Sequence, residues 1–167
     1  MTGIPDDLAA LIGRPQFAQV SDGAVEAGAI RLFAAAVQDG TPAYWADDPA
    51  VVFAPPALLS AWNRPVMWHP GGDVGTSGLA LHFLVKDRLG LPRAIVAEME
   101  SEAAAPIRPG VRVRSEQILV DLGEPCTTRL GDGRYWTIRV EYRCAGDDTL
   151  FGAETLRFFG YGAESAA

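Results

Sequence analysis

The spacing of apolar residues divides the chain into a first half of helices and turns and a second half of strands. Residues 25–38 are apolar almost all the way round, with Arg31 as the only charge after the first turn. This pattern predicts a helix that other elements surround, rather than a helix laid on a surface. Glycine or proline follows the apolar positions of residues 5–13 and 79–89, which predicts two further helices, and residues 16–20 are typical of a first strand.

The second half has long segments of strand character joined by turn residues. Aspartate and glycine between these segments favour hairpins. Four strands are predicted, at residues 94–105, 111–122, 134–144 and 149–159. In the first of them, Ile95, Ala97 and Met99 are expected to share one face. One antiparallel sheet and one buried helix, residues 25–38, predict an α+β fold in which the sheet wraps around a central helix, the hot-dog arrangement.

Length and charge limit the remaining possibilities. The chain has 167 residues, which predicts a single domain over residues 1–161 with a frayed tail at 162–167. It carries 14 basic against 21 acidic residues, which argues against nucleic-acid or anionic-membrane partners. There is no apolar run of about 18 residues, and because the first residues lack the charged-then-apolar pattern of an export signal, we expect no export. Cys126 and Cys144 lack metal-ligand spacing, so we expect reduced thiols, a cytoplasmic protein and no metal or other cofactor.

The loop after the predicted central helix carries the candidate chemistry. Its residues 38–44 read Gln-Asp-Gly-Thr-Pro-Ala-Tyr. Further along come Ala-Pro-Pro at 54–56 leading to Trp62, Pro-Ile-Arg-Pro-Gly at 106–110, and Glu-Pro-Cys-Thr-Thr-Arg-Leu-Gly at 124–131. In this order and spacing, the segments resemble the MaoC-like, FAS1-type N-terminal dehydratases of the hot-dog fold. The likeness extends along most of the chain, and it is strongest to the non-catalytic subunits of actinobacterial heteromeric steroid enoyl-CoA hydratases.

One replacement within the loop separates this chain from catalytic members of that family. Their pattern is Gly-Asp-x-Asn-Pro-x-His. Asp39 and Pro42 are kept here, whereas Gln38, Thr41 and Tyr44 replace the glycine, the asparagine and the histidine. A phenol titrates near pH 10, so Tyr44 is a poor base for water at neutral pH. The resemblance therefore implies a chain that lacks half of the catalytic pair.

The resemblance also implies that a partner subunit supplies the missing histidine. In this family, many members work as two hot dogs, of which one supplies the Asp/His pair and the other shapes the acyl pocket. We expect a smaller MaoC-like partner carrying Asp-x-x-x-x-His, in a heterodimer or an α2β2 heterotetramer, and possible contact with a downstream aldolase or thiolase. The expected reaction adds water to a 2-enoyl-coenzyme A, with a steroid side-chain thioester as the expected substrate.

The resemblance implies no catalytic residue in this chain and a set of substrate-contacting residues: Asp39, Tyr44, Trp45, Trp62, Met67, Trp68, Thr128 and Arg129. A weaker alternative makes the chain self-sufficient through Asp39 and His69. Each feature also has a structural interpretation, since Asp39 can close a turn through backbone N–H groups. His82 is expected to be structural.

Three other functions stay open. The first is a subunit of a 3-hydroxyacyl-carrier-protein dehydratase in long-chain fatty-acid elongation. The second is a module that binds acyl-CoA or acts as a scaffold without doing chemistry. The third, a thioesterase, is disfavoured because Glu26 is the only acid that the predicted central helix offers.

Overall fold

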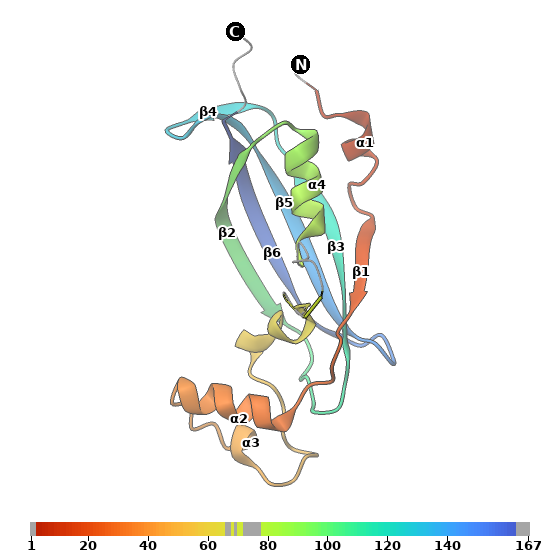
Figure 1. Ribbon diagram of the computed structural model, residues 1–167, viewed down its shortest axis with the longest axis vertical. Coiled ribbons are helices and arrows are strands. Elements are labelled where there is room, and N and C mark those ends of the chain that lie inside the picture. The colour runs from red at the N-terminus through yellow and green to blue at the C-terminus, as the bar shows by residue number, and fades with distance from the viewer. Residues whose placement is uncertain (1–2, 66–67, 69, 72–77, 163–167) are drawn as a thin grey trace.

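A six-stranded antiparallel sheet forms the body of the protein in the computed structural model, which describes residues 3–65, 68, 70–71 and 78–162 (Figure 1). Its strand order is β1-β3-β5-β6-β2, and β4 pairs with the start of β5. The strands are β1 (Pro15–Val20), β2 (Arg93–Ala103), β3 (Val113–Leu122), β4 (Cys126–Thr128), β5 (Gly131–Cys144) and β6 (Leu150–Tyr161). The predicted strands are confirmed, and β4 adds a short hairpin at one end of the sheet.

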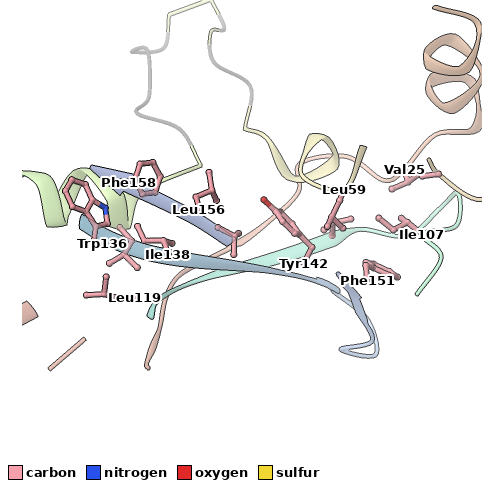
Figure 2. Packing of buried hydrophobic residues seen from close by; sticks show 14 of the residues in the cluster. Val25, Leu59, Ile107, Leu119, Trp136, Ile138, Tyr142, Phe151, Leu156 and Phe158 are labelled. Atoms are coloured by element: carbon pink, nitrogen blue, oxygen red, sulfur yellow. The ribbon is translucent and has the colours of Figure 1, made fainter. Parts of the chain in front are cut away.

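Strict alternation along β5 gives the sheet an inner and an outer face. Trp136, Ile138, Val140 and Tyr142 are buried on the inner face, where they pack in one hydrophobic core (Figure 2). The intervening side chains point outward, because successive residues of a strand face opposite sides. In β6, the inner positions are Gly152, Glu154, Leu156, Phe158 and Gly160, as the pairing with β5 requires.

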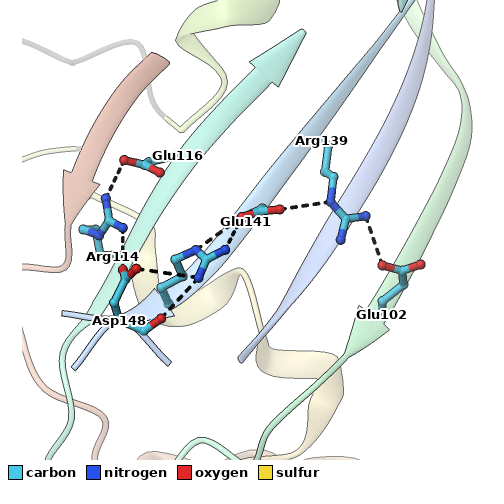
Figure 3. A network of polar contacts seen from close by, with 7 residues as sticks. Glu102, Arg114, Glu116, Arg139, Glu141 and Asp148 are labelled. Carbon is cyan, nitrogen blue, oxygen red and sulfur yellow. Dashed lines mark hydrogen bonds and ion pairs between the residues drawn. The ribbon is translucent and has the colours of Figure 1, made fainter. Parts of the chain in front are cut away.

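The outer face is covered by a network of charged side chains (Figure 3). Glu141 lies at its centre and accepts hydrogen bonds from Arg139 and Arg143 at 3.4 Å and 2.8 Å. Arg143 and Arg114 both reach Asp148. The arginines hold the pKa of Glu141 below its usual value, chiefly through the hydrogen bond from Arg143. This face suits water, whereas apolar side chains gather on the inner face.

The helix packed on the inner face is α4 (Ala80–Arg88), which runs along the sheet in Figure 1. Its buried residues are Leu81, His82 and Val85, three positions on one side of a helix. They belong with Trp136 and Phe158 to the core at this end of the sheet. The predicted α+β arrangement of a sheet around a helix is therefore confirmed, with α4 in the central position.

The prediction that residues 25–38 form the central helix is wrong. Residues Ala27–Ala36 do form a helix, α2, but it lies with α3 (Pro42–Trp45) beyond the end of the sheet (Figure 1). Only Ile30 and Ala34 of α2 are buried, and Leu32 is 74% exposed. Alanine and glycine make the segment look apolar all round, yet such small residues gain little from burial, so they did not require a surrounding sheet.

A β-bulge in β2 shows that the prediction of one shared face for Ile95, Ala97 and Met99 is wrong. Ile95 pairs with Phe159, whereas Met99 pairs with Leu156 on the opposite face of β6. The register shifts between Val96 and Glu98, which inserts one extra residue into β2. Ile95 and Met99 therefore do not share a face.

The described part of the chain contains three further short elements. These are α1 (Asp6–Ala9) and two 3-10 turns, η1 (Pro56–Leu58) and η2 (Ala61–Asn63). Asn63 is buried and donates hydrogen bonds to the carbonyls of Val113 at 2.7 Å and Gln19 at 3.3 Å. Because these carbonyls belong to β3 and β1, Asn63 fixes the segment after η2 against the sheet.

Candidate functional site

A pocket of about 420 Å³ opens on the inner face of the sheet, beside the start of α4. Its volume lies within the ~300–1,000 Å³ typical of small-molecule sites. Its apolar lining residues include Leu79, Met99, Val140 and Leu156. Its polar lining residues are Ser60, Asn63, Arg64, Ser115, Tyr142 and Glu154. A hydrocarbon group with one polar substituent would match this division.

Tyr142 and Glu154 form the polar floor of the pocket. The Tyr142 hydroxyl donates a hydrogen bond of 3.2 Å to Oε2 of Glu154. Strand register produces this contact, because Glu154 pairs with Val140, two residues before Tyr142 on the same face. Tyr142 is 6% exposed and Glu154 is 8% exposed. An acid and a phenol are thus held together at the bottom of a largely apolar surface.

The surroundings of Tyr142 keep the phenol protonated. Burial raises the pKa of Tyr142, and the neighbouring charge of Glu154 raises it further. Ser60 and Arg64 act in the opposite direction without cancelling the effect. At neutral pH, Tyr142 is therefore a hydrogen-bond donor whose proton is directed at Glu154.

Ser115 and Asn63 satisfy one another on the adjoining wall. The Ser115 hydroxyl donates to Oδ1 of Asn63, and both residues are buried. Near the start of α4, the amide of Leu81 donates to Oε1 of Gln117 at 3.0 Å. These groups stabilise the pocket wall, and they leave Glu154 as the buried acceptor available to a ligand.

The Asp39 loop lies elsewhere, between α2 and α3. The Asp39 carboxylate accepts hydrogen bonds from the backbone N–H of Thr41 at 2.9 Å and from its hydroxyl at 2.7 Å. These bonds lower the pKa of Asp39, with the bond from the Thr41 side chain as the larger cause. This geometry is that of a side chain closing a tight turn.

The two aromatic residues of the loop differ, because Tyr44 is buried whereas Trp45 is 45% exposed. Tyr44 is 6% exposed and its ring meets that of Phe53 edge-on at 5.6 Å. Burial raises the pKa of Tyr44, and the Asp39 charge contributes in the same direction. The Trp45 indole donates a 2.8 Å hydrogen bond to the backbone oxygen of Asp39. Neither aromatic residue, nor Asp39, lines the pocket beside α4.

The remaining predicted substrate contacts are spread over the molecule. Trp62 packs at the edge of the core, and Trp68 is 65% exposed. Thr128 and Arg129 belong to the β4 hairpin, at the opposite end of the sheet from α2 and α3 (Figure 1). Met67 and His69 lie outside the described residues. Within one chain, the described members of the predicted set do not converge on a single site.

His82 is the one histidine among the described residues, and it is part of the core. Its ring lies among Phe83, Trp136 and Phe158. This position agrees with the expected structural role.

The sequence did not lead us to predict the pair of Tyr142 and Glu154, although it contains an indication of it. Both residues lie on strands whose inner positions, apart from Arg134 near the start of β5, are otherwise apolar or glycine. A carboxylate at such a position is costly to bury without a partner, so its presence indicates either a partner or a function.

A second, smaller pocket of about 230 Å³ lies near the end of β2. Its lining is almost wholly apolar and includes Phe53, Leu59, Ile107, Phe151 and residues 103–105. Among the residues that the structure describes, no group of three His, Cys, Asp or Glu side chains is placed to hold a metal ion. Over the same part of the chain, no helix is long and apolar enough to cross a membrane.

Comparison with known structures agrees with this fold. The ChsH1–ChsH2 complex from Mycobacterium tuberculosis contains a chain that superposes with a TM-score of 0.71 at 20% identity, covering 96% of this chain and 92% of that one. The HadBC (3R-hydroxyacyl-ACP dehydratase) complex from the same organism gives 0.54 at 13% identity, covering 88% and 96%. A MaoC-like dehydratase gives 0.56 at 18% identity, covering 94% of this chain and 44% of that one.

The family model for the FAS1-like dehydratase domain region matches residues 10–148. The sequence matches no curated protein. The family match covers most of the chain, and the similar structures include hydratases and dehydratases. The chain therefore belongs to the FAS1-like dehydratase family and has the hot-dog fold of these enzymes.

Proposed function

We propose that this chain is the pocket-forming, non-catalytic subunit of a heteromeric 2-enoyl-CoA hydratase. Water adds across the 2,3-double bond of the thioester and gives a 3-hydroxyacyl-CoA. A smaller hot-dog partner supplies the aspartate and histidine that orient and deprotonate the water. The substrate is a thioester with a bulky acyl group such as a steroid side chain, and the complex acts in the cytoplasm.

The observation that carries the proposal is the state of the Asp39 loop. Tyr44 stands in place of the histidine, and the Asp39 carboxylate is bound to Thr41. His82, the only described histidine, lies on α4 within the aromatic core rather than in this loop. A water molecule at Asp39 would therefore meet no described imidazole, and an acid without a base is a poor catalyst for reversible hydration.

The free edge of the sheet supports a partner. β2 is an edge strand of 11 residues, and within the described part of the chain it pairs only with β6. Ile95, Val96 and Met99 on it are 42%, 52% and 54% exposed. A long edge strand with exposed apolar side chains is a ready site for pairing with another chain, although β2 also carries Glu98, Glu100 and Glu102. A second apolar surface is offered by α2 and the residue that caps its C-terminus, where Leu32 and Val37 are 74% and 54% exposed.

The two cavities support a role in substrate binding. The larger one borders Met99 of β2, so a partner paired along β2 would lie next to it. Arg129 is exposed on the β4 hairpin and forms no ion pair with a described residue, which leaves it available to a coenzyme A phosphate.

The proposal is tested by co-expressing the chain with candidate hot-dog partners and measuring native mass and hydration of 2-enoyl-CoA. We expect a stable mixed complex that hydrates the substrate. Val96→Lys, which places a charge on the free edge, should abolish the complex, whereas Leu130→Lys on the β4 hairpin should preserve it. If Val96→Lys leaves both the complex and its activity unchanged, the partner does not pair along β2.

The same preparations separate the alternatives. If the complex turns over linear 3-hydroxyacyl-carrier-protein substrates faster than bulky CoA thioesters, it is the dehydratase of fatty-acid elongation. A pure scaffold would tolerate Leu156→Trp, which fills the pocket, without a change in rate. We expect this variant to lower the rate while the complex stays intact.

A further inference from the structure

Glu154 is the only ionisable side chain on the inner face of β6. It is 8% exposed and forms no ion pair with any described residue. Its Oε2 accepts the Tyr142 hydrogen bond, and no described residue donates to its Oε1. A carboxylate can accept about four hydrogen bonds. Glu154 is therefore a buried acceptor with unused capacity, and it lines the pocket beside α4.

The direction of the Tyr142 hydrogen bond decides which ligand groups fit. A phenol has one proton, and here Tyr142 gives it to Glu154. The pair consequently presents only acceptor lone pairs to the cavity. A ligand hydroxyl can donate to them, whereas a ketone oxygen would face two acceptors and lose its hydrogen bonds to water without replacement.

The neighbouring polar groups do not reverse this preference. Asn63 and Ser115 are bonded to each other, and Asn63 also bonds to two backbone carbonyls. Ser60 and the exposed Arg64 also line the pocket, and both lower the pKa of Tyr142, Ser60 through a hydrogen bond from its hydroxyl and Arg64 through its charge. Leu79, Met99, Val140 and Leu156 supply the apolar part of the lining, with Val140 paired directly with Glu154. The pocket thus combines hydrocarbon side chains with a buried acceptor.

We propose that the pocket binds a bulky hydrocarbon group that carries a hydroxyl, with Glu154 as the residue that selects for it. The identification of that group as part of an acyl thioester rests on the proposed function. Glu154 acts in specificity and takes no part in hydration, so its loss should affect which acyl group is bound rather than the chemical step.

The test uses two bicyclic probes with the same skeleton, trans-2-decalol and trans-2-decalone. Calorimetry with the full chain should show the alcohol binding about tenfold more tightly or better, as expected for a hydrogen bond to a buried charged acceptor. Glu154→Gln, whose amide can donate to a ketone, should bring the two dissociation constants within about twofold or reverse their order. Tyr142→Phe keeps the carboxylate and should keep the preference for the alcohol.

Glu100→Gln is the matched control, because Glu100 pairs with Thr155 on the outer face and lies outside the pocket. It should bind both probes as the unaltered chain does. If Glu154→Gln does not fold, the unaltered chain and Tyr142→Phe still decide the question. Equal affinities for the two probes, tighter binding of the ketone, or no binding of either by the chain and its complex would overturn the inference.

Failure of this inference can be told apart from failure of the proposed function. A complex that hydrates 2-enoyl-CoA thioesters while its pocket ignores the hydroxyl overturns only the inference. A chain that prefers the alcohol yet supports hydration with no partner overturns only the proposed function.

Discussion

The imidazole of His82 lies against the ring of Phe158, with the two ring centroids 4.1 Å apart. Trp136 flanks it at 5.5 Å, and Nδ1 of His82 is buried with no hydrogen-bond partner among the described residues. Burial lowers the pKa of His82 to about 4, and the positive charge of Lys86 adds to this effect. The central helix therefore holds a histidine that is neutral in the folded protein at every physiological pH.

The stability of the chain should fall as the pH is lowered from about 6.5 to about 4. In this window the unfolded state binds a proton at His82 and the folded state does not, so acid favours unfolding. The full effect is of the order of 3 kcal/mol, since each unit of pKa difference corresponds to about 1.4 kcal/mol. Urea unfolding at several pH values measures it.

His82→Leu is the control for that prediction. It removes the titrating group from an apolar site, so the slope between pH 6.5 and 5 should largely disappear. Below pH 4.5 both proteins should still weaken, because the pKa of Glu141 is lowered by its arginines and protonation breaks those contacts. An unchanged slope above pH 5 in the variant would refute the role given to His82.

Asn63→Ala should lower the free energy of unfolding by roughly 2–4 kcal/mol. It leaves buried carbonyls of β1 and β3 without donors and deprives Ser115 of its acceptor. Ser115→Ala removes one bond and should cost about 1 kcal/mol. Denaturant titration of both single variants and the double variant should give a clear coupling energy. Strictly additive losses would show that the pair does not act together.

Gly160→Ala should destabilise the protein because a methyl group there would lie 2.5 Å from the Trp136 ring and 2.9 Å from Leu91. Trp136 is fully buried and has no room to move. We expect a loss of about 1–3 kcal/mol, the range for overpacked cores. Gly28→Ala, in α2 with open space around it, should instead be neutral or slightly stabilising. Thermal melts of the two variants should shift in opposite directions or by clearly different amounts.

Asp39→Asn should leave the hydration rate of the assembled complex within about tenfold of the original, whereas loss of a catalytic carboxylate costs ~10⁴-fold or more. Asparagine can close the same turn by accepting the hydrogen bonds from Thr41. Steady-state rates of the complex carrying Asp39→Asn provide the measurement. A collapse of the rate with the complex intact would make Asp39 a catalytic acid after all.

The sequence predicted the sheet well because β-strands of 10 to 14 residues with alternating burial leave a clear pattern, as in β3 and β5. It failed on the central helix, since the alanine-rich α2 looked more buried than α4, which ends in Lys86 and Arg88. Only the three-dimensional arrangement shows that Leu81, His82 and Val85 form the buried side.

For the candidate site, the sequence predicted the role of a single residue but did not predict which residues lie together. The turn-closing role of Asp39 follows from its sequence neighbours Gly40, Thr41 and Pro42. The pairing of Tyr142 with Glu154 depends on the register of β5 against β6, which a residue pattern does not specify.

The most direct test of the account is the hydration rate of a 2-enoyl-CoA measured with the purified chain alone and then with increasing amounts of a hot-dog partner that carries the Asp/His pair. Without the partner, no rate above that of buffer is predicted. As the partner is added, the rate should rise and reach a plateau at the stoichiometry of the complex. Substantial turnover by the chain alone would contradict the central claim that this subunit lacks the base needed to activate water.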